Sequence, residues 1–281
     1  MAAIQKAFFT AAMAGLATAL LLTCALLRAG PEVVGSAGAR PEDYLSGVVA
    51  ELTRQWPANR TINIVCHGHS VPAGYFRTPL VDTFNAYPHL LHRGHKERFP
   101  YAVVNVVVTA IGGENSESGA NRFERDVLSL RPDVVTIDYA LNDRSIGLAR
   151  AEAAWQAMIA KAKAAGVKVI LLTPTPDTSA KLGDPNDPLN QHAQQIRALA
   201  RRNGVALVDS LACFEERIRN GEPLDGLMSQ SNHPNRKGHD VVATELLRWF
   251  PGLPATVNPI NACPSLAGAS LYETSNGAAC W

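Results

Sequence analysis

The sequence predicts an α/β domain of three layers, doubly wound, in which helices cover both faces of a five-stranded parallel sheet. Five short apolar segments, rich in β-branched residues, alternate along the chain with helical segments. Each of the five is apolar nearly throughout, which is typical of strands buried on both faces. No internal repeat is visible, and 281 residues suit one such domain with an extension at each end.

The elements are expected in the following order. A helix over residues 40–57 comes first, because Pro41 and two acidic residues begin it and apolar residues recur at helical spacing. The strands are expected at residues 61–66, 101–108, 133–138, 167–172 and 205–209. The remaining helices are expected at residues 79–98 (interrupted near Pro88), 119–130, 148–165, 188–203, 210–220 and 236–250. Pro and Asp residues predict a surface loop at residues 174–188.

The N-terminus differs in composition from this core. Lys6 precedes an uncharged apolar run over residues 7–27, and Ala37-Gly38-Ala39 fits a signal cleavage site. We therefore expect an extracytoplasmic protein, secreted or periplasmic. An uncleaved membrane anchor is the main alternative, since the run is nearly long enough to span a bilayer, and a buried core helix is the third interpretation.

These boundaries predict three parts. Residues 1–39 are the signal peptide or N-terminal membrane anchor, residues 40–250 form the α/β domain, and residues 251–281 form an irregular tail. Cys263 and Cys280 lie in that tail, and an exported chain could join them as a disulfide. The net charge of +1 and the lack of a long basic run exclude nucleic acid as the expected partner.

Small and polar residues follow four of the five predicted strands. They are Gly68-His69-Ser70, Gly112-Gly113, Asn142-Asp143 and Asn232-His233-Pro234. In an open parallel sheet the carboxyl ends of the strands share one edge, which is where ligands bind. That edge receives a hydroxyl, a glycine turn, an amide and an imidazole. Acyl transfer needs this set of groups, namely a nucleophile, a base and N–H donors for the developing oxyanion.

In this order the four segments resemble the sequence blocks of the SGNH (GDSL-type) hydrolases, over roughly residues 61–250. The resemblance implies a flavodoxin-like SGNH hydrolase fold and a serine esterase that needs no metal or organic cofactor. It assigns the nucleophile to Ser70 and the general base to His233. The oxyanion donors that it implies are the backbone N–H groups of Ser70 and Gly113 and the side chain of Asn142.

The substrate class is less closely defined by the resemblance. Members of the family cleave acetyl groups from sugars, lipid esters and other small esters. Expected export and the absence of an apolar lid favour an O-acetylated carbohydrate, although a lipid ester stays open, as does membrane attachment through the N-terminal segment. The alternatives to an esterase are a non-catalytic carbohydrate-binding protein that retains the fold and an O-acyltransferase.

Two departures from the family's blocks leave its four catalytic residues in place. His69 replaces an Asp in the first block, and Ala140 replaces a Gly in the third. His67 and His69 form a His-x-His pair that could bind a metal, but no third ligand is evident in the sequence.

A third departure affects the mechanism. Gln230 replaces the Asp that orients the histidine in this family. Because Gln carries no charge, we expect a dyad in which the imidazole of His233 is held by a neutral acceptor. That acceptor is either the Gln230 amide oxygen or a backbone carbonyl within residues 229–232. A triad completed by Asp225 is the alternative.

Overall fold

The computed structural model describes residues 38–252. Its centre is a five-stranded sheet with the strand order β2-β1-β3-β4-β5, in which every neighbouring pair is parallel. The strands are β1 Thr61–Gly68, β2 Val103–Val108, β3 Val134–Asp138, β4 Lys168–Leu172 and β5 Ala206–Val208. The order reverses beside β1, so the chain winds outward in both directions, and the predicted doubly wound fold is confirmed.

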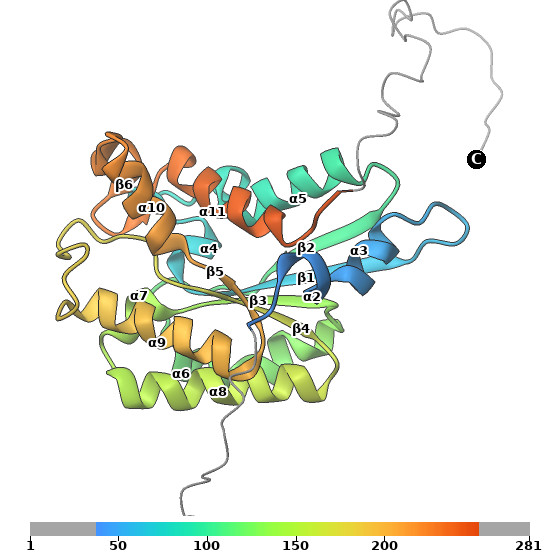
Figure 1. Cartoon of the computed structure of the whole chain (residues 1–281), viewed down its shortest axis with the longest axis horizontal. Helices are drawn as coiled ribbons and strands as arrows, with labels where there is room; N and C mark the ends of the chain where they lie inside the picture. Colours follow the sequence, from blue (N-terminus) through green and yellow to red (C-terminus); the bar gives the residue numbers. More distant parts are fainter. Residues whose placement is uncertain (1–37, 253–281) are drawn as a thin grey trace, which may run out of the picture. The chain divides into compact units, whose positions relative to one another are not determined.

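Helices form a layer on each face of the sheet (Figure 1). One layer contains α3 Ser46–Leu52, α5 Tyr87–Arg98, α10 Ser210–Arg219 and α11 Arg236–Arg248. The other contains α6 Ser116–Asp126, α8 Leu148–Ala164 and α9 Pro188–Asn203. Each helix layer forms a hydrophobic core with one face of the sheet. Side chains of β1 alternate between these cores: Ile62, Ile64 and Cys66 pack against the first layer, and Val65 packs against the second.

Several short elements connect the strands and the longer helices. They are α2 Pro41–Tyr44, α4 Ser70–Ala73, α7 Ala140–Asp143, η1 Thr83–Asn85, η2 Leu128–Leu130, η3 Leu224–Gly226, β6 Met228–Gln230 and β7 His233–Pro234. The antiparallel pair of β6 and β7 was not expected from the sequence. Its strands are three and two residues long, too short to show the alternation that identifies a strand.

The helical segment expected over residues 79–98 is interrupted near Pro88, as predicted. η1 ends at Asn85, and Pro88 lies in the first turn of α5, which tolerates a residue without an N–H. Three other boundary predictions differ from the structure. Helix α6 begins three residues earlier than expected, where the Asn115 side chain accepts from the N–H of Ser118 at 3.2 Å. The expected surface loop begins with four buried residues, 174–177, which follow shortly after β4. The single helix expected over 40–57 is divided at Leu45 and ends at Leu52.

Predictions for the two ends of the chain lie outside the described residues. These are the signal peptide or anchor, and the disulfide between Cys263 and Cys280. Between residues 38 and 252, no helix combines the length and the apolar character that crossing a membrane requires.

Candidate active site

Ser70 and His233 meet at the carboxyl edge of the sheet. The Oγ of Ser70 lies 2.9 Å from Nε2 of His233, and Nδ1 of the same ring lies 2.8 Å from the backbone carbonyl oxygen of Phe76. A carbonyl oxygen only accepts, so Nδ1 carries the proton and Nε2 presents its lone pair to the serine hydroxyl. The structure therefore holds the imidazole in the tautomer that can take a proton from Ser70.

Ser70 reaches this position because β1 passes directly into a short helix. At Gly68, an added Cβ would lie 2.5 Å from the carbonyl oxygen of Asp138 and 2.7 Å from Pro72, so only glycine permits this close approach. Ser70 is the first residue of α4, and the N–H groups of a first helical turn have no intrahelical acceptor. Its own N–H consequently points away from the helix and is available to a ligand.

His233 is supplied by the β6–β7 pair. The hydroxyl of Ser229 donates to the His233 carbonyl at 3.0 Å, and the Asn235 side chain accepts from two N–H groups at the start of α11. The ring is buried, and burial lowers the pKa of His233, an effect that the Phe76 carbonyl opposes. The imidazole is therefore neutral near pH 7, as a general base must be.

None of the three acceptors predicted for His233 is the one observed. Gln230 instead accepts from the N–H of Thr78 at 2.9 Å and donates to Asn232 at 2.9 Å. Asp225 lies exposed in η3. The acceptor is the carbonyl of Phe76, which comes from the segment after α4 and not from residues 229–232. The expected neutral acceptor is present, but its position was predicted wrongly, because any residue can supply a backbone carbonyl.

Gly113 and Asn142 come from the two neighbouring loops. Gly113 has φ +77°, a conformation that glycine adopts without strain, and it is exposed. Among residues 38–252, the N–H groups of Ser70 and Gly113 have no hydrogen-bond acceptor. Asn142 lies in α7 and donates one amide hydrogen to the carbonyl of Glu114 at 2.9 Å. Its second amide hydrogen is left for another acceptor.

His69 immediately precedes Ser70 and is fully buried. Its Nδ1 accepts from the N–H of Val71 at 3.3 Å and lies 3.4 Å from the Ser70 hydroxyl, while Nε2 lies 3.3 Å from Asp138. The hydroxyl of Tyr87 donates to the other oxygen of Asp138 at 3.3 Å. His69 thus caps α4, which the Asp of the family's first block could also do with its carboxylate oxygen.

The two histidines of the His-x-His pair have separate partners. His67 contacts the Thr109 hydroxyl at 2.9 Å and the Gly119 carbonyl at 3.2 Å, whereas His69 contacts Asp138. Burial lowers the pKa of His67 to about 4, so this ring is neutral. Within the described part of the chain, no group of three or more His, Cys, Asp or Glu side chains is arranged to hold a metal ion.

Tyr75 and Asp143 contact the segments that carry the site residues. The ring of Tyr75 lies 6.0 Å from that of His233, and a Cβ on Gly112 would come within 2.9 Å of it. Tyr75 therefore joins the glycine turn to the histidine. Asp143, next to Asn142, accepts from the N–H of Ser116 at 2.8 Å and from the indole of Trp155 at 2.6 Å, so its carboxylate links α7 to α6 and α8.

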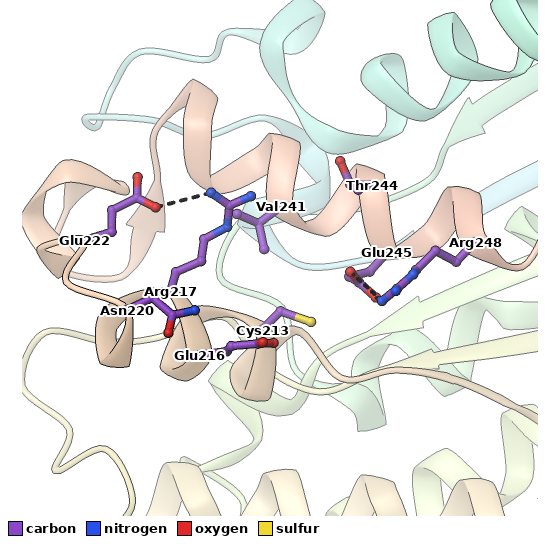
Figure 2. A pocket seen from close by; sticks show the side chains of 9 residues that line it. All are labelled: Cys213, Glu216, Arg217, Asn220, Glu222, Val241, Thr244, Glu245 and Arg248. Carbon is purple, nitrogen blue, oxygen red and sulfur yellow. Dashed lines mark hydrogen bonds and ion pairs between the residues drawn. The ribbon is translucent and has the colours of Figure 1, made fainter.

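A hollow of about 560 Å³ lies between α10 and α11, apart from these residues. Figure 2 shows the thiol of Cys213 beside the ion pairs Arg217–Glu222 and Arg248–Glu245. Burial raises the pKa of Cys213 to about 12, so the thiol stays protonated and is a poor nucleophile. Neither Ser70 nor His233 lines this hollow.

A doubly wound parallel sheet with a hydrogen-bonded serine and histidine beyond its carboxyl edge is the architecture of an ester hydrolase. The sequence profile of the GDSL-like lipase/acylhydrolase family matches residues 66–241, well over half of the chain. The protein belongs to this family, which is the one that its four sequence blocks resemble.

Several known proteins are similar to this chain. An acetylxylan esterase from Geobacillus stearothermophilus is 24% identical over 162 residues, which cover 53% of this chain and 74% of the relative. The crystal structure of an acetylxylan esterase from that organism has a TM-score of 0.59 at 21% identity, covering 67% of this chain and 94% of the other. A two-domain esterase active on acetylated mannans has a TM-score of 0.60 at 21% identity, covering 74% and 52%. These likenesses agree with the SGNH hydrolase fold.

Proposed function

We propose that this protein is a serine esterase that removes O-acetyl groups from carbohydrate through an acyl-enzyme. The observation that carries the proposal is the hydrogen bond of 2.9 Å between the Ser70 hydroxyl and Nε2 of His233, in a ring whose other nitrogen donates to the Phe76 carbonyl. A buried serine and a neutral imidazole in this geometry form an activated nucleophile.

The reaction proceeds in two halves. His233 takes the proton of Ser70 as Oγ bonds to the ester carbonyl carbon, and the oxyanion accepts from the N–H groups of Ser70 and Gly113 and from the Asn142 amide. His233 then gives its proton to the leaving sugar oxygen as the C–O bond breaks. Water attacks the acetyl-serine with His233 again as base, which releases acetate and restores Ser70.

The substrate class is supported by the relatives and by the N-terminal sequence. Similar proteins include an acetylxylan esterase and an esterase active on acetylated mannans, both of which act on acetylated polysaccharides. Such polymers lie outside the cytoplasm, and the apolar segment at residues 7–27 reads as an export signal. We therefore place the protein outside the cytoplasm. N-terminal sequencing of the mature protein tests the cleavage before Arg40.

Labelling and substitution of Ser70 test the nucleophile. A serine-directed fluorophosphonate should attach to Ser70, and Ser70→Ala should lose acetate release from acetylated xylo-oligosaccharides and from p-nitrophenyl acetate. Ser210 is a matched control, because it is another buried serine at the first position of a helix, in α10. Ser210→Ala should keep labelling and activity. Label on another residue, with activity intact in Ser70→Ala, would refute the assignment.

A further inference from the structure

The glycine turn that supplies Gly113 needs anchors on both sides. Gly112 and Gly113 are exposed, and neighbouring glycines leave the backbone more conformational freedom than any other pair of residues. The N–H of Ile111 donates to the Gly68 carbonyl at 3.0 Å, which fixes the turn to β1 on its upstream side. An oxyanion donor is effective only when it is held in place before the charge develops. The downstream side therefore also needs a fixed residue, and that residue is Glu114.

The side chain of Glu114 is held in a buried cluster with Arg122 and Tyr139. The guanidinium of Arg122 binds both carboxylate oxygens, with Nε donating to Oε1 at 2.8 Å and Nη2 donating to Oε2. The hydroxyl of Tyr139 donates to Oε2 at 2.8 Å. The side chains of Arg122 and Glu114 are 9% and 8% exposed, so water screens this pair little. A bidentate pair of this kind fixes direction as well as distance.

Tyr139 connects the cluster to the sheet. Its hydroxyl accepts from Nη2 of Arg122 at 3.1 Å and lies 3.1 Å from Nε2 of His67 on β1. Burial raises the pKa of Tyr139, so the hydroxyl keeps the proton that it donates to Glu114. Against this ring packs Gly119 of α6, where an added Cβ would lie 2.4 Å from it. The carboxylate of Glu114 is thus attached to both β1 and α6.

The main chain of Glu114 serves the other oxyanion donor. Its carbonyl accepts one amide hydrogen of Asn142 at 2.9 Å, which sets the orientation of the second amide hydrogen. One residue is therefore joined to Gly113 by a peptide bond and to Asn142 by a hydrogen bond. We propose that Glu114 is a positioning residue for the oxyanion hole and that it acts through these two donors. This inference rests on the proposed esterase function.

The test compares two Glu–Arg pairs whose glutamates lie near the start of α6. Glu114→Gln removes the negative charge from the buried pair, and Tyr139→Phe removes a single hydroxyl from the cluster. Both variants should lower kcat for p-nitrophenyl acetate, by about ten- to a hundredfold for Glu114→Gln, with KM within about threefold. The reason is that a misplaced oxyanion donor stabilises the transition state less but hardly affects substrate binding. The control is Glu117→Gln, which breaks a similar bidentate pair with Arg150 that is exposed. It should keep kcat within about twofold.

A double-mutant cycle separates positioning from a general loss of structure. Once Asn142→Ala has removed its donor, the further loss caused by Glu114→Gln should be several-fold smaller than in the unmodified protein. Full additivity, a change confined to KM, or an equal loss in Glu117→Gln would overturn the inference. If Glu114→Gln fails to fold by circular dichroism, Tyr139→Phe decides. An active Ser70→Ala would instead overturn the proposed function, whatever the Glu114 variants do.

Discussion

The neutral partner of His233 leads to a prediction about Asp225. In a serine triad, a carboxylate on Nδ1 stabilises the imidazolium, and its loss costs about 10⁴ in rate, or about 5.5 kcal/mol of barrier. In this protein the Phe76 carbonyl occupies that position at 2.8 Å, and Asp225 is exposed in η3. Asp225→Asn should therefore lower kcat by less than about tenfold, which corresponds to less than about 1.4 kcal/mol.

Gln230→Asp is the complementary change, because it restores the residue that the family has at this position. The Gln230 side chain forms hydrogen bonds with Thr78 and Asn232, whereas the ring nitrogens of His233 bond to Phe76 and Ser70. A carboxylate there adds a favourable charge near the imidazolium without displacing the Phe76 carbonyl, so kcat should stay the same or rise. Both variants are assayed as kcat and kcat/KM on p-nitrophenyl acetate between pH 5 and 9. Thermal unfolding shows in parallel that they are folded.

One result would refute this reasoning about the dyad. A thousandfold loss in a folded Asp225→Asn protein would mean that η3 moves in solution and brings the carboxylate to His233. The active enzyme would then have a triad, and the contact with the Phe76 carbonyl would belong to a resting state. A loss of that size in Gln230→Asp alone would show that the bond from Thr78 to Gln230 is needed to hold the Phe76 segment.

Two further outcomes are expected. Asn142→Ala should lower kcat about 10²–10³-fold with KM little changed, since an oxyanion donor acts in the transition state. A change in KM alone would mean that Asn142 only holds the loop through its hydrogen bond to Glu114. His95 is buried against Phe250, and burial lowers its pKa to about 4, below the usual value of about 6.5, so only the unfolded chain binds this proton between those pH values. The contribution of neutral His95 to the free energy of unfolding is therefore full above pH 6.5 and is lost as pH falls towards 4. Between pH 7 and 5, the free energy of unfolding, measured with urea, should fall by about 2 kcal/mol more in the unmodified protein than in His95→Leu. Parallel pH dependences in the two proteins would contradict this.

The sheet could be predicted because its signal is local. Each strand is a short apolar run, and the observed strands begin and end within two residues of the predicted ones. Strand β1 extends to Gly68, two residues beyond its predicted end. The prediction ended early because histidine and glycine are not typical strand residues. The interruption near Pro88 could be predicted as well, because a proline is tolerated in the first turn of a helix but not in its interior.

The parts of the site that could not be predicted depend on contacts between distant segments. Phe76 acts through its carbonyl, a group that every residue has, and it lies 157 positions before His233. The role of Glu114 depends on an arginine eight residues later and a tyrosine after the next strand. Side-chain chemistry identified Ser70 and His233, but only the fold shows which backbone groups surround them.

Charge is distributed unevenly around this site, and the distribution suits the reaction. In the proposed mechanism, the histidine that becomes positive faces a neutral carbonyl, whereas the buried ion pair lies beside the loop where negative charge would develop. A bare carboxylate on Glu114, one residue from the N–H of Gly113, would repel the oxyanion. Its bidentate pairing with Arg122, which also contacts Asp126, offsets that charge, so the glutamate can hold the loop with less repulsion of the transition state. This requirement explains why the carboxylate next to Gly113 has a bidentate arginine and a tyrosine hydroxyl as partners, while a backbone carbonyl is sufficient for His233.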